Sequence, residues 1–264
     1  MTLVTLLTII FFVFGLIIGS FLNVAICRYN TSKSFGGRSV CMSCNTTLSW
    51  YELIPLLSFL ALGARCKSCK VKISLQYPLV ESITGIIFAA LFLKFQNFFF
   101  TSTLAFAGLY AYSAAMFSLL LVIAAYDLRH KIIPDTLAFV FGALAFLGLF
   151  LFSSQGVRIH VPALSSFLSG LVIAIPFALF WFLSRGRWMG LGDAKLAVGL
   201  GWFLGLSRVL SATILAFWTG ALVGIFLILF GWKHGIKSEI PFAPFLVFGA
   251  AAVFLFELSL LPGF

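Results

Sequence analysis

Apolar runs separated by short polar segments repeat along almost the whole chain. Most of these runs approach or exceed the ~20 residues that cross a bilayer as a helix. The pattern predicts an all-α polytopic membrane protein with about eight transmembrane helices, of which the sixth is short and rich in glycine. The predicted spans are residues 2–26, 79–95, 104–125, 136–152, 163–183, 194–206, 209–231 and 241–261.

Polar residues gather in one long segment, residues 27–78, which divides the chain into three predicted parts. Residues 1–26 form a retained first transmembrane helix, because the run is too long for the apolar core of a cleaved signal and has no clear small-residue cleavage site. Residues 27–78 form a cytoplasmic zinc-binding loop, and residues 79–264 form a seven-helix membrane domain. With 62% hydrophobic residues, 9% charged residues and a mean hydropathy of +1.16, the chain lies far outside the soluble globular class.

Basic residues fall mainly on one side of the predicted spans. If residues 27–78 are cytoplasmic, 14 of the 17 Lys and Arg residues lie on the cytoplasmic face, as the positive-inside rule expects, and both termini lie outside. The net charge of +10 is then a topology signal, and we expect contact with membrane lipid but not with nucleic acid. The cytoplasmic set is Arg28, Lys33, Arg38, Arg65, Lys67, Lys70, Lys72, Arg129, Lys131, Arg185, Arg187, Lys195, Lys233 and Lys237.

The three aspartates of the chain share one predicted membrane edge. Asp127 ends the third span, Asp193 opens the sixth, and Asp135 follows Pro134 where it is placed to cap the next helix. Asp193 belongs to a Gly-Leu-Gly-Asp stretch, and glycines at positions 190 and 192 permit the close approach of an extended substrate segment beside the carboxylate. The alternative is that Asp193 only caps a helix by accepting backbone hydrogen bonds.

Two CxxC pairs in the polar segment have the spacing of zinc knuckles. Cys41 and Cys44 form the first pair, and Cys66 and Cys69 form the second. Four thiolates would fill the coordination sphere of Zn²⁺, which makes the metal structural; two disulfides or free thiols are the alternatives. Between the pairs lies an apolar stretch, residues 48–60, that is too short to span and suits the membrane interface.

Two further groups of residues have ordinary structural explanations. Glu81 stands near a predicted helix start, where the helix dipole favours an acid, although its position within a span also makes it a candidate substrate-binding residue. The histidines at positions 130, 160 and 234 lie in different predicted loops, and we expect them to be solvated rather than to bind a metal.

The absence of several motifs limits the classes of enzyme to which the chain could belong. No Ser or Cys is coupled recognisably to a histidine, and neither HExxH nor a GxGxxG loop after a strand occurs. Two carboxyl groups at one depth in a poorly hydrated place would share a single proton. The ionised member can deprotonate water while the protonated member polarises a peptide carbonyl, which is aspartic proteolysis. Two alternatives are a transporter with an aspartate ion relay and a non-catalytic zinc-stabilised assembly factor.

These motifs together resemble the type IV prepilin peptidases, bacterial GxGD membrane aspartic peptidases, over nearly the whole chain. The matching pieces are Gly19 to Val24 with Arg28, the CxxC pairs, Tyr77 to Glu81, Asp127 with Pro134 and Asp135, Met189 to Leu196, and Pro241 to Phe245. The chain departs from the common family pattern at Gln76, where arginine is frequent, and at Ala243, where glycine is frequent.

The resemblance implies the site, the substrate and a second activity. It implies that Asp127 and Asp193 are catalytic, that Asp135 is not, and that the enzyme removes short basic leaders of prepilins or pseudopilins at the inner membrane. It implies too that the new amino terminus is methylated with S-adenosylmethionine. Because six of the seven acidic residues fall near the cytoplasmic face, we also expect some of them, Glu52 and Glu239 among them, to contact leader lysines.

Overall fold

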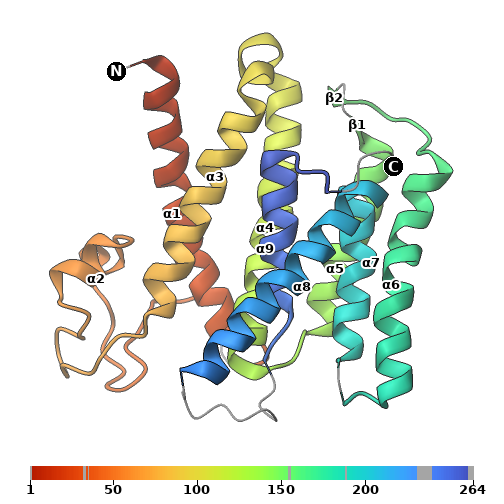
Figure 1. Cartoon of the computed structure of the whole chain (residues 1–264). Helices are drawn as coiled ribbons and strands as arrows, with labels where there is room; N and C mark the ends of the chain where they lie inside the picture. Colours follow the sequence, from red (N-terminus) through yellow and green to blue (C-terminus); the bar gives the residue numbers. More distant parts are fainter. Residues whose placement is uncertain are drawn as a thin grey trace. The chain divides into compact units, whose positions relative to one another are not determined.

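The computed structural model describes residues 2–31, 34, 36–153, 156–187, 189–230 and 240–260, and the chain forms two compact units, Met1–Gln96 and Asn97–Phe264 (Figure 1). The elements of the described residues are, in order, α1 (Leu3–Arg28), the 3-10 helix η1 (Trp50–Leu53), α2 (Leu57–Ala61), α3 (Gln76–Thr101), α4 (Thr103–His130), α5 (Asp135–Leu151), β1 (Phe152–Ser153), β2 (Gly156–Val157), α6 (Leu164–Ser184), α7 (Leu191–Leu204), α8 (Leu206–Leu229) and α9 (Ala243–Phe256).

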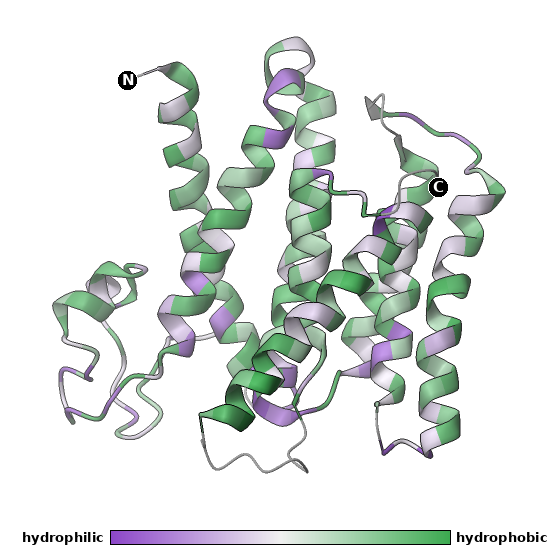
Figure 2. Cartoon of the chain, viewed as in Figure 1, coloured by the Kyte–Doolittle hydropathy of each residue, from purple (hydrophilic) through white to green (hydrophobic). Residues whose placement is uncertain are grey.

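A helix lies at each of the eight predicted spans, and five of these helices are long and apolar enough to cross a membrane. The five are α1, α3, α4, α6 and α8, while α5 and α9 are apolar but shorter. Figure 2 shows the hydrophobic colouring running along these helices. Large apolar side chains are exposed on α1 and α8. Within the most apolar 18 residues of each of these helices, only 11% are buried. Apolar faces of this size suit lipid, so a helical, multi-pass membrane protein is confirmed.

Local signals set several helix ends. Ser102 caps α4 through a bond from the Ala105 N–H to its hydroxyl. Lys131, in the left-handed region, ends α4 ahead of Pro134, which cannot continue a helix. Gly205 separates α7 from α8 with a φ of +78°, a conformation that favours glycine. The short β1–β2 hairpin between α5 and α6 was not predicted.

In the first unit, small residues let α1 and α3 pack closely. A Cβ at Gly15 would lie 2.7 Å from the Phe88 Cβ, and a Cβ at Gly19 would lie 2.7 Å from the Glu81 Cα. The Asn23 amide donates to the Tyr77 carbonyl oxygen at 3.0 Å. Close backbone approach and side-chain hydrogen bonds are the usual means of joining helices in a membrane.

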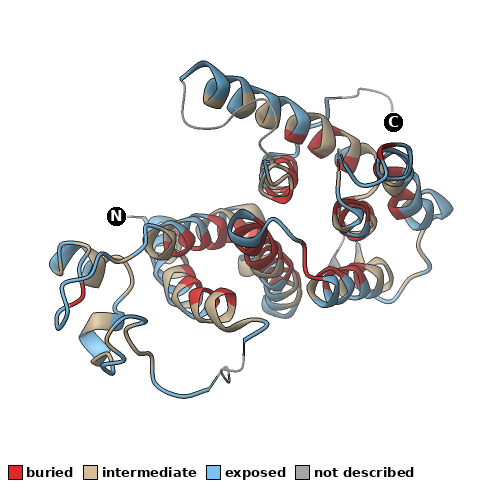
Figure 3. Ribbon diagram, turned by 90° about the horizontal axis from the view of Figure 1, so that it is seen from below, coloured by how far each residue is buried: buried red, intermediate tan, exposed pale blue. Residues whose placement is uncertain are grey.

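In the second unit, aromatic rings join α7 to its neighbours. The ring of Phe203 lies 5.6 Å from Phe117 on α4, 6.2 Å from Phe141 on α5 and 5.1 Å from Phe254 on α9, measured between centroids. Figure 3 shows buried residues along the sides of these helices that face one another. Each such ring pair contributes about 0.5–1.5 kcal/mol, so the cluster fixes α7 against the helix that carries Asp127.

Candidate active site and metal centre

Asp127 is buried at the end of α4 and meets the start of α9. Its side chain is 5% exposed, and its Oδ2 accepts a hydrogen bond from the Ala243 N–H at 3.2 Å. Ala243 is the first residue of α9 and is fully buried. The first N–H groups of a helix have no partner within the helix, and the positive end of its dipole attracts anions. The Asp127 carboxylate therefore lies at a ready-made anion-binding position.

Asp193 is buried in the first turn of α7. It is 8% exposed, its carboxylate lies beside Gly190, and it is within range of the charge of Asp127. Gly190, not Asp193, is the N-cap residue of α7, so Asp193 lies three residues further on, in the first turn. The two aspartates predicted to meet are thus both buried and within electrostatic range of each other.

The two glycines before Asp193 have different surroundings. A Cβ at Gly192 would lie 2.8 Å from the Ile133 Cβ, a distance that Cβ atoms essentially never show. A Cβ at Gly190 would meet nothing closer than the Asp193 Oδ2 at 3.7 Å, and Gly190 is exposed. Packing therefore explains Gly192, whereas Gly190 has the open surroundings that an approaching peptide would need.

Asp135, the third aspartate, is exposed and paired. It is the first residue of α5 and follows the N-cap residue Pro134, so the prediction that it caps the helix is wrong. Instead its Oδ1 lies 2.7 Å from the Lys195 Nζ, and the two side chains are 71% and 43% exposed. Exposed ion pairs of this kind contribute little to stability. Asp135 thus differs from Asp127 and Asp193, which are both buried.

Four cysteines form one cluster in the first unit. The Sγ atoms of Cys41, Cys44, Cys66 and Cys69 all lie within 4.8 Å of one another. The Sγ atoms of Cys41 and Cys69 are 3.8 Å apart. Tetrahedral zinc with Zn–S bonds of about 2.3 Å requires about 3.8 Å between sulfurs, so the cluster fits one such ion.

The two CxxC pairs have the same backbone geometry. The Cys41 N–H donates to the Thr46 carbonyl and the Cys66 N–H to the Val71 carbonyl, five residues on in each case. Asn45 and Lys70, four residues after these cysteines, both have positive φ. Thr46 lowers the pKa of the Cys44 thiol to about 6 through hydrogen bonds from its hydroxyl and backbone. A thiolate is the form that binds metal, so the surroundings of Cys44 favour ligation.

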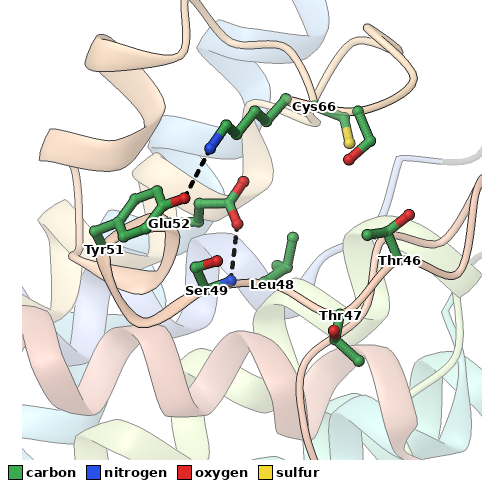
Figure 4. Close-up of a pocket in the computed structure, with 9 residues that line it drawn as sticks. Thr46, Thr47, Leu48, Ser49, Tyr51, Glu52 and Cys66 are labelled. Atoms are coloured by element: carbon green, nitrogen blue, oxygen red, sulfur yellow. Dashed lines mark hydrogen bonds between the residues drawn. The ribbon is translucent and has the colours of Figure 1, made fainter.

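A hollow of about 290 Å³ lies between the first knuckle, η1 and the second knuckle (Figure 4). Its charged groups are engaged with neighbours: the Lys67 Nζ donates to the Tyr51 hydroxyl at 2.8 Å, and Glu52 accepts from the Ser49 N–H at 2.8 Å. The Lys67 contact lowers the pKa of Tyr51. Glu52 thus completes a capping box at η1, and its predicted contact with leader lysines stays a prediction.

Glu81 does not lie at the helix start, where the sequence analysis placed it. Because α3 begins at Gln76, Glu81 is the sixth helical residue and lies beyond the first turn where the helix dipole acts. Its Oε2 accepts a hydrogen bond from the Leu56 N–H at 2.9 Å. The hydrogen bond to the loop at Leu56 therefore accounts for an acid at position 81. No local sequence pattern predicts this bond.

The remaining predicted residues are consistent with structural roles or lie outside the described residues. His130 ends α4 with its ring 4.3 Å from that of Tyr126, and His160 contacts the Arg158 carbonyl. Within the described ranges neither belongs to a group that could hold a metal. His234 and Glu239, like Lys33, Lys233 and Lys237, lie outside the described residues.

Sequence reasoning missed the Ala243 N–H as a partner of Asp127. Residues 240–245 read as an aromatic break at the entry to the last span, although prolines on both sides of a small residue are a signal of a helix start. The partner could not be named from this signal because it lies 116 residues away.

Comparison with known proteins covers both units. Residues 13–95 match the family model described as the bacterial peptidase A24 N-terminal domain, and residues 114–225 match the type IV leader peptidase family. No solved structure matches the chain.

Curated relatives match over most of the chain, and each is named prepilin leader peptidase/N-methyltransferase. A protein of Myxococcus xanthus is 38% identical over 86% of this chain, which spans 65% of that relative's length. A Bacillus subtilis protein is 34% identical over 96% of this chain and 95% of its own, and one from Aeromonas hydrophila is 34% identical over 89% and 86%. The family predicted from the motifs is confirmed: this chain belongs to the type IV leader peptidase family.

Proposed function

We propose that this chain is an intramembrane aspartic endopeptidase that removes the short basic leader of prepilins or pseudopilins, with Asp127 and Asp193 as the catalytic pair. The observation that carries the proposal is the burial of both carboxylates within electrostatic range of each other in the second unit. The names of its relatives and the matching family model support the substrate class.

The contacts of the two aspartates suggest which one acts as the general base and which as the general acid. The hydrogen bond from Ala243 and the start of α9 stabilise negative charge on Asp127, which we therefore assign as the ionised member that deprotonates the attacking water. Asp193 then holds the shared proton and donates it toward the scissile carbonyl oxygen. The exposed Gly190 lies beside Asp193, where an extended leader segment can approach.

The chain's placement in the membrane follows from helices and charge. We propose that the eight helices at the predicted spans, α1 and α3 to α9, all cross the bacterial inner membrane, with both termini outside and the loop of residues 27–78 in the cytoplasm. The three parts 1–26, 27–78 and 79–264 would then be a first span, a zinc-binding loop and a seven-helix peptidase domain. Zn²⁺ held by the four cysteines would be structural, because four thiolates leave no open position.

A second step is proposed from the names of the relatives. These are N-methyltransferases as well as peptidases, and S-adenosylmethionine would supply the methyl group for the new N-terminal amine. The ion-relay alternative has no support from the family to which the chain belongs.

A leader-cleavage assay on one prepilin peptide tests the peptidase proposal. The purified proteins are wild type, Asp127→Asn, Asp193→Asn and, as the matched control, Asp135→Asn. We expect either buried substitution to lower kcat/KM by about 10²–10⁴-fold or more, because each carboxyl group does acid–base work, and the control to retain activity. Folding is checked by thermal unfolding and metal content. Substantial activity in Asp127→Asn or Asp193→Asn would remove that residue from the mechanism.

A further inference from the structure

The chain between the two zinc knuckles passes through a strained turn at Leu56. Leu56 has a φ of +59° and a ψ of −48°, and the Leu57 N–H donates to the Pro55 carbonyl at 2.6 Å. This is a γ-turn with positive φ at its centre, which is rare and unfavourable for a residue with a side chain. Such a conformation persists only where the surrounding structure holds it.

A buried carboxylate holds this turn from the neighbouring helix. The Leu56 N–H donates to the Glu81 Oε2 at 2.9 Å, and the Glu81 side chain is 7% exposed. The Glu81 backbone is fixed, because Gly19 of α1 packs directly against its Cα. The acceptor is thus immobilised by two helices before it meets the loop.

The direction of the loop depends on this turn. Helix α2 begins at Leu57, the residue after the turn, and the second knuckle follows from Cys66. The large apolar side chains of Trp50, Leu57 and Leu60 are exposed on both sides of the turn. A change at Leu56 would therefore redirect α2 and the exposed apolar side chains together.

We infer that Glu81 is a positioning residue whose buried carboxylate holds Leu56 in the γ-turn and so fixes the inter-knuckle segment, residues 50–61, against α3. Its role is exerted through the loop and not by contact with the leader peptide. The effect on leader cleavage rests on the proposed function; the effect on the segment itself does not.

Hydrogen exchange of residues 50–61, measured by mass spectrometry on the full-length zinc-loaded protein in detergent, tests this inference. The variants are Glu81→Ala, Glu81→Gln, Leu56→Gly and the double variant Glu81→Ala/Leu56→Gly. We expect Glu81→Ala to accelerate exchange by about tenfold or more, and Glu81→Gln, which keeps a carbonyl acceptor, by less than about threefold. In the Leu56→Gly background the alanine substitution should have less than about a threefold effect, because glycine adopts positive φ without strain.

Specific results would overturn the inference. Unchanged exchange over residues 50–61 in Glu81→Ala would do so, as would equal acceleration along α1 and α3, which would indicate general destabilisation. In the cleavage assay, recovery of the lost kcat/KM by Leu56→Gly supports positioning. Loss without recovery and with unchanged exchange would assign Glu81 to the substrate instead. If the wild-type protein cleaves no leader, the proposed function fails while the exchange data still decide the role of Glu81.

Discussion

Alanine substitution at the two glycines of the Gly-Leu-Gly-Asp stretch should separate packing from substrate approach. At Gly192 the new Cβ would lie 2.8 Å from the Ile133 Cβ, whereas ordinary contact begins at 3.4 Å. The first turn of α7 must therefore move by about 0.6 Å or more, a strain that costs about 1–3 kcal/mol in packed cores. Asp193 is the next residue, and a shift approaching 1 Å in a catalytic group costs up to about 10²-fold in rate.

Gly190→Ala is the matched comparison, because the nearest atom to its new Cβ is the Asp193 Oδ2 at an ordinary 3.7 Å. We expect Gly192→Ala to lower both the Tm and kcat/KM, and Gly190→Ala to keep the wild-type Tm while raising KM for the leader peptide. Thermal unfolding in detergent and initial cleavage rates over a range of substrate concentrations measure both effects. A Gly192→Ala protein with wild-type Tm and activity would refute the packing argument, and an unchanged KM in Gly190→Ala would refute substrate approach at that position.

Two other predictions concern the metal and the aromatic cluster. Treatment with a strong zinc chelator, or the substitution Cys66→Ser, should release the metal. Proteolysis within residues 36–75 should then become faster while the second unit stays folded. Metal that is still bound, as measured by mass spectrometry, would contradict the four-thiolate site. Phe203→Ala removes four ring pairs worth about 0.5–1.5 kcal/mol each, so it should lower the Tm and the cleavage rate together. Phe230→Ala is the control and should change neither, because its ring contacts Phe226 at the end of α8.

The sequence predicts the helices well because their signal is local. Each long apolar run became one helix, with ends displaced by a few residues, since run length and hydropathy depend on neighbours along the chain. The start of α7 is an instructive difference: the predicted span opens at residue 194, but the helix begins at Leu191 and includes Gly192. Glycine weakens a helix, yet here the close packing of Ile133 against Gly192 outweighs that intrinsic preference.

The metal cluster and the aspartate pair were predictable for different reasons. The CxxC spacing fixes the ligand geometry within each knuckle, and the two pairs need only meet. For the aspartates, the order of the spans placed both at one membrane edge. The contacts of Glu81 with Leu56 and of Asp135 with Lys195 join residues 25 and 60 positions apart without any local pattern. Such pairings depend on tertiary packing, so the roles assigned to both acids from helix-start rules were wrong.

The hydrogen bond between Ala243 and Asp127 supplies a partner for two polar groups that lie far apart in the sequence. A carboxylate buried at the end of α4 needs a hydrogen-bond donor, because burying an unpartnered charge is costly. The first residue of α9 carries an N–H that its own helix cannot use, and the next residue, Pro244, has no N–H to offer. Since α4 and α9 pack together, one hydrogen bond satisfies both groups. The Pro-Phe-Ala-Pro stretch therefore has a structural reason beyond aromatic packing: it presents a free backbone donor to the aspartate that we propose activates water.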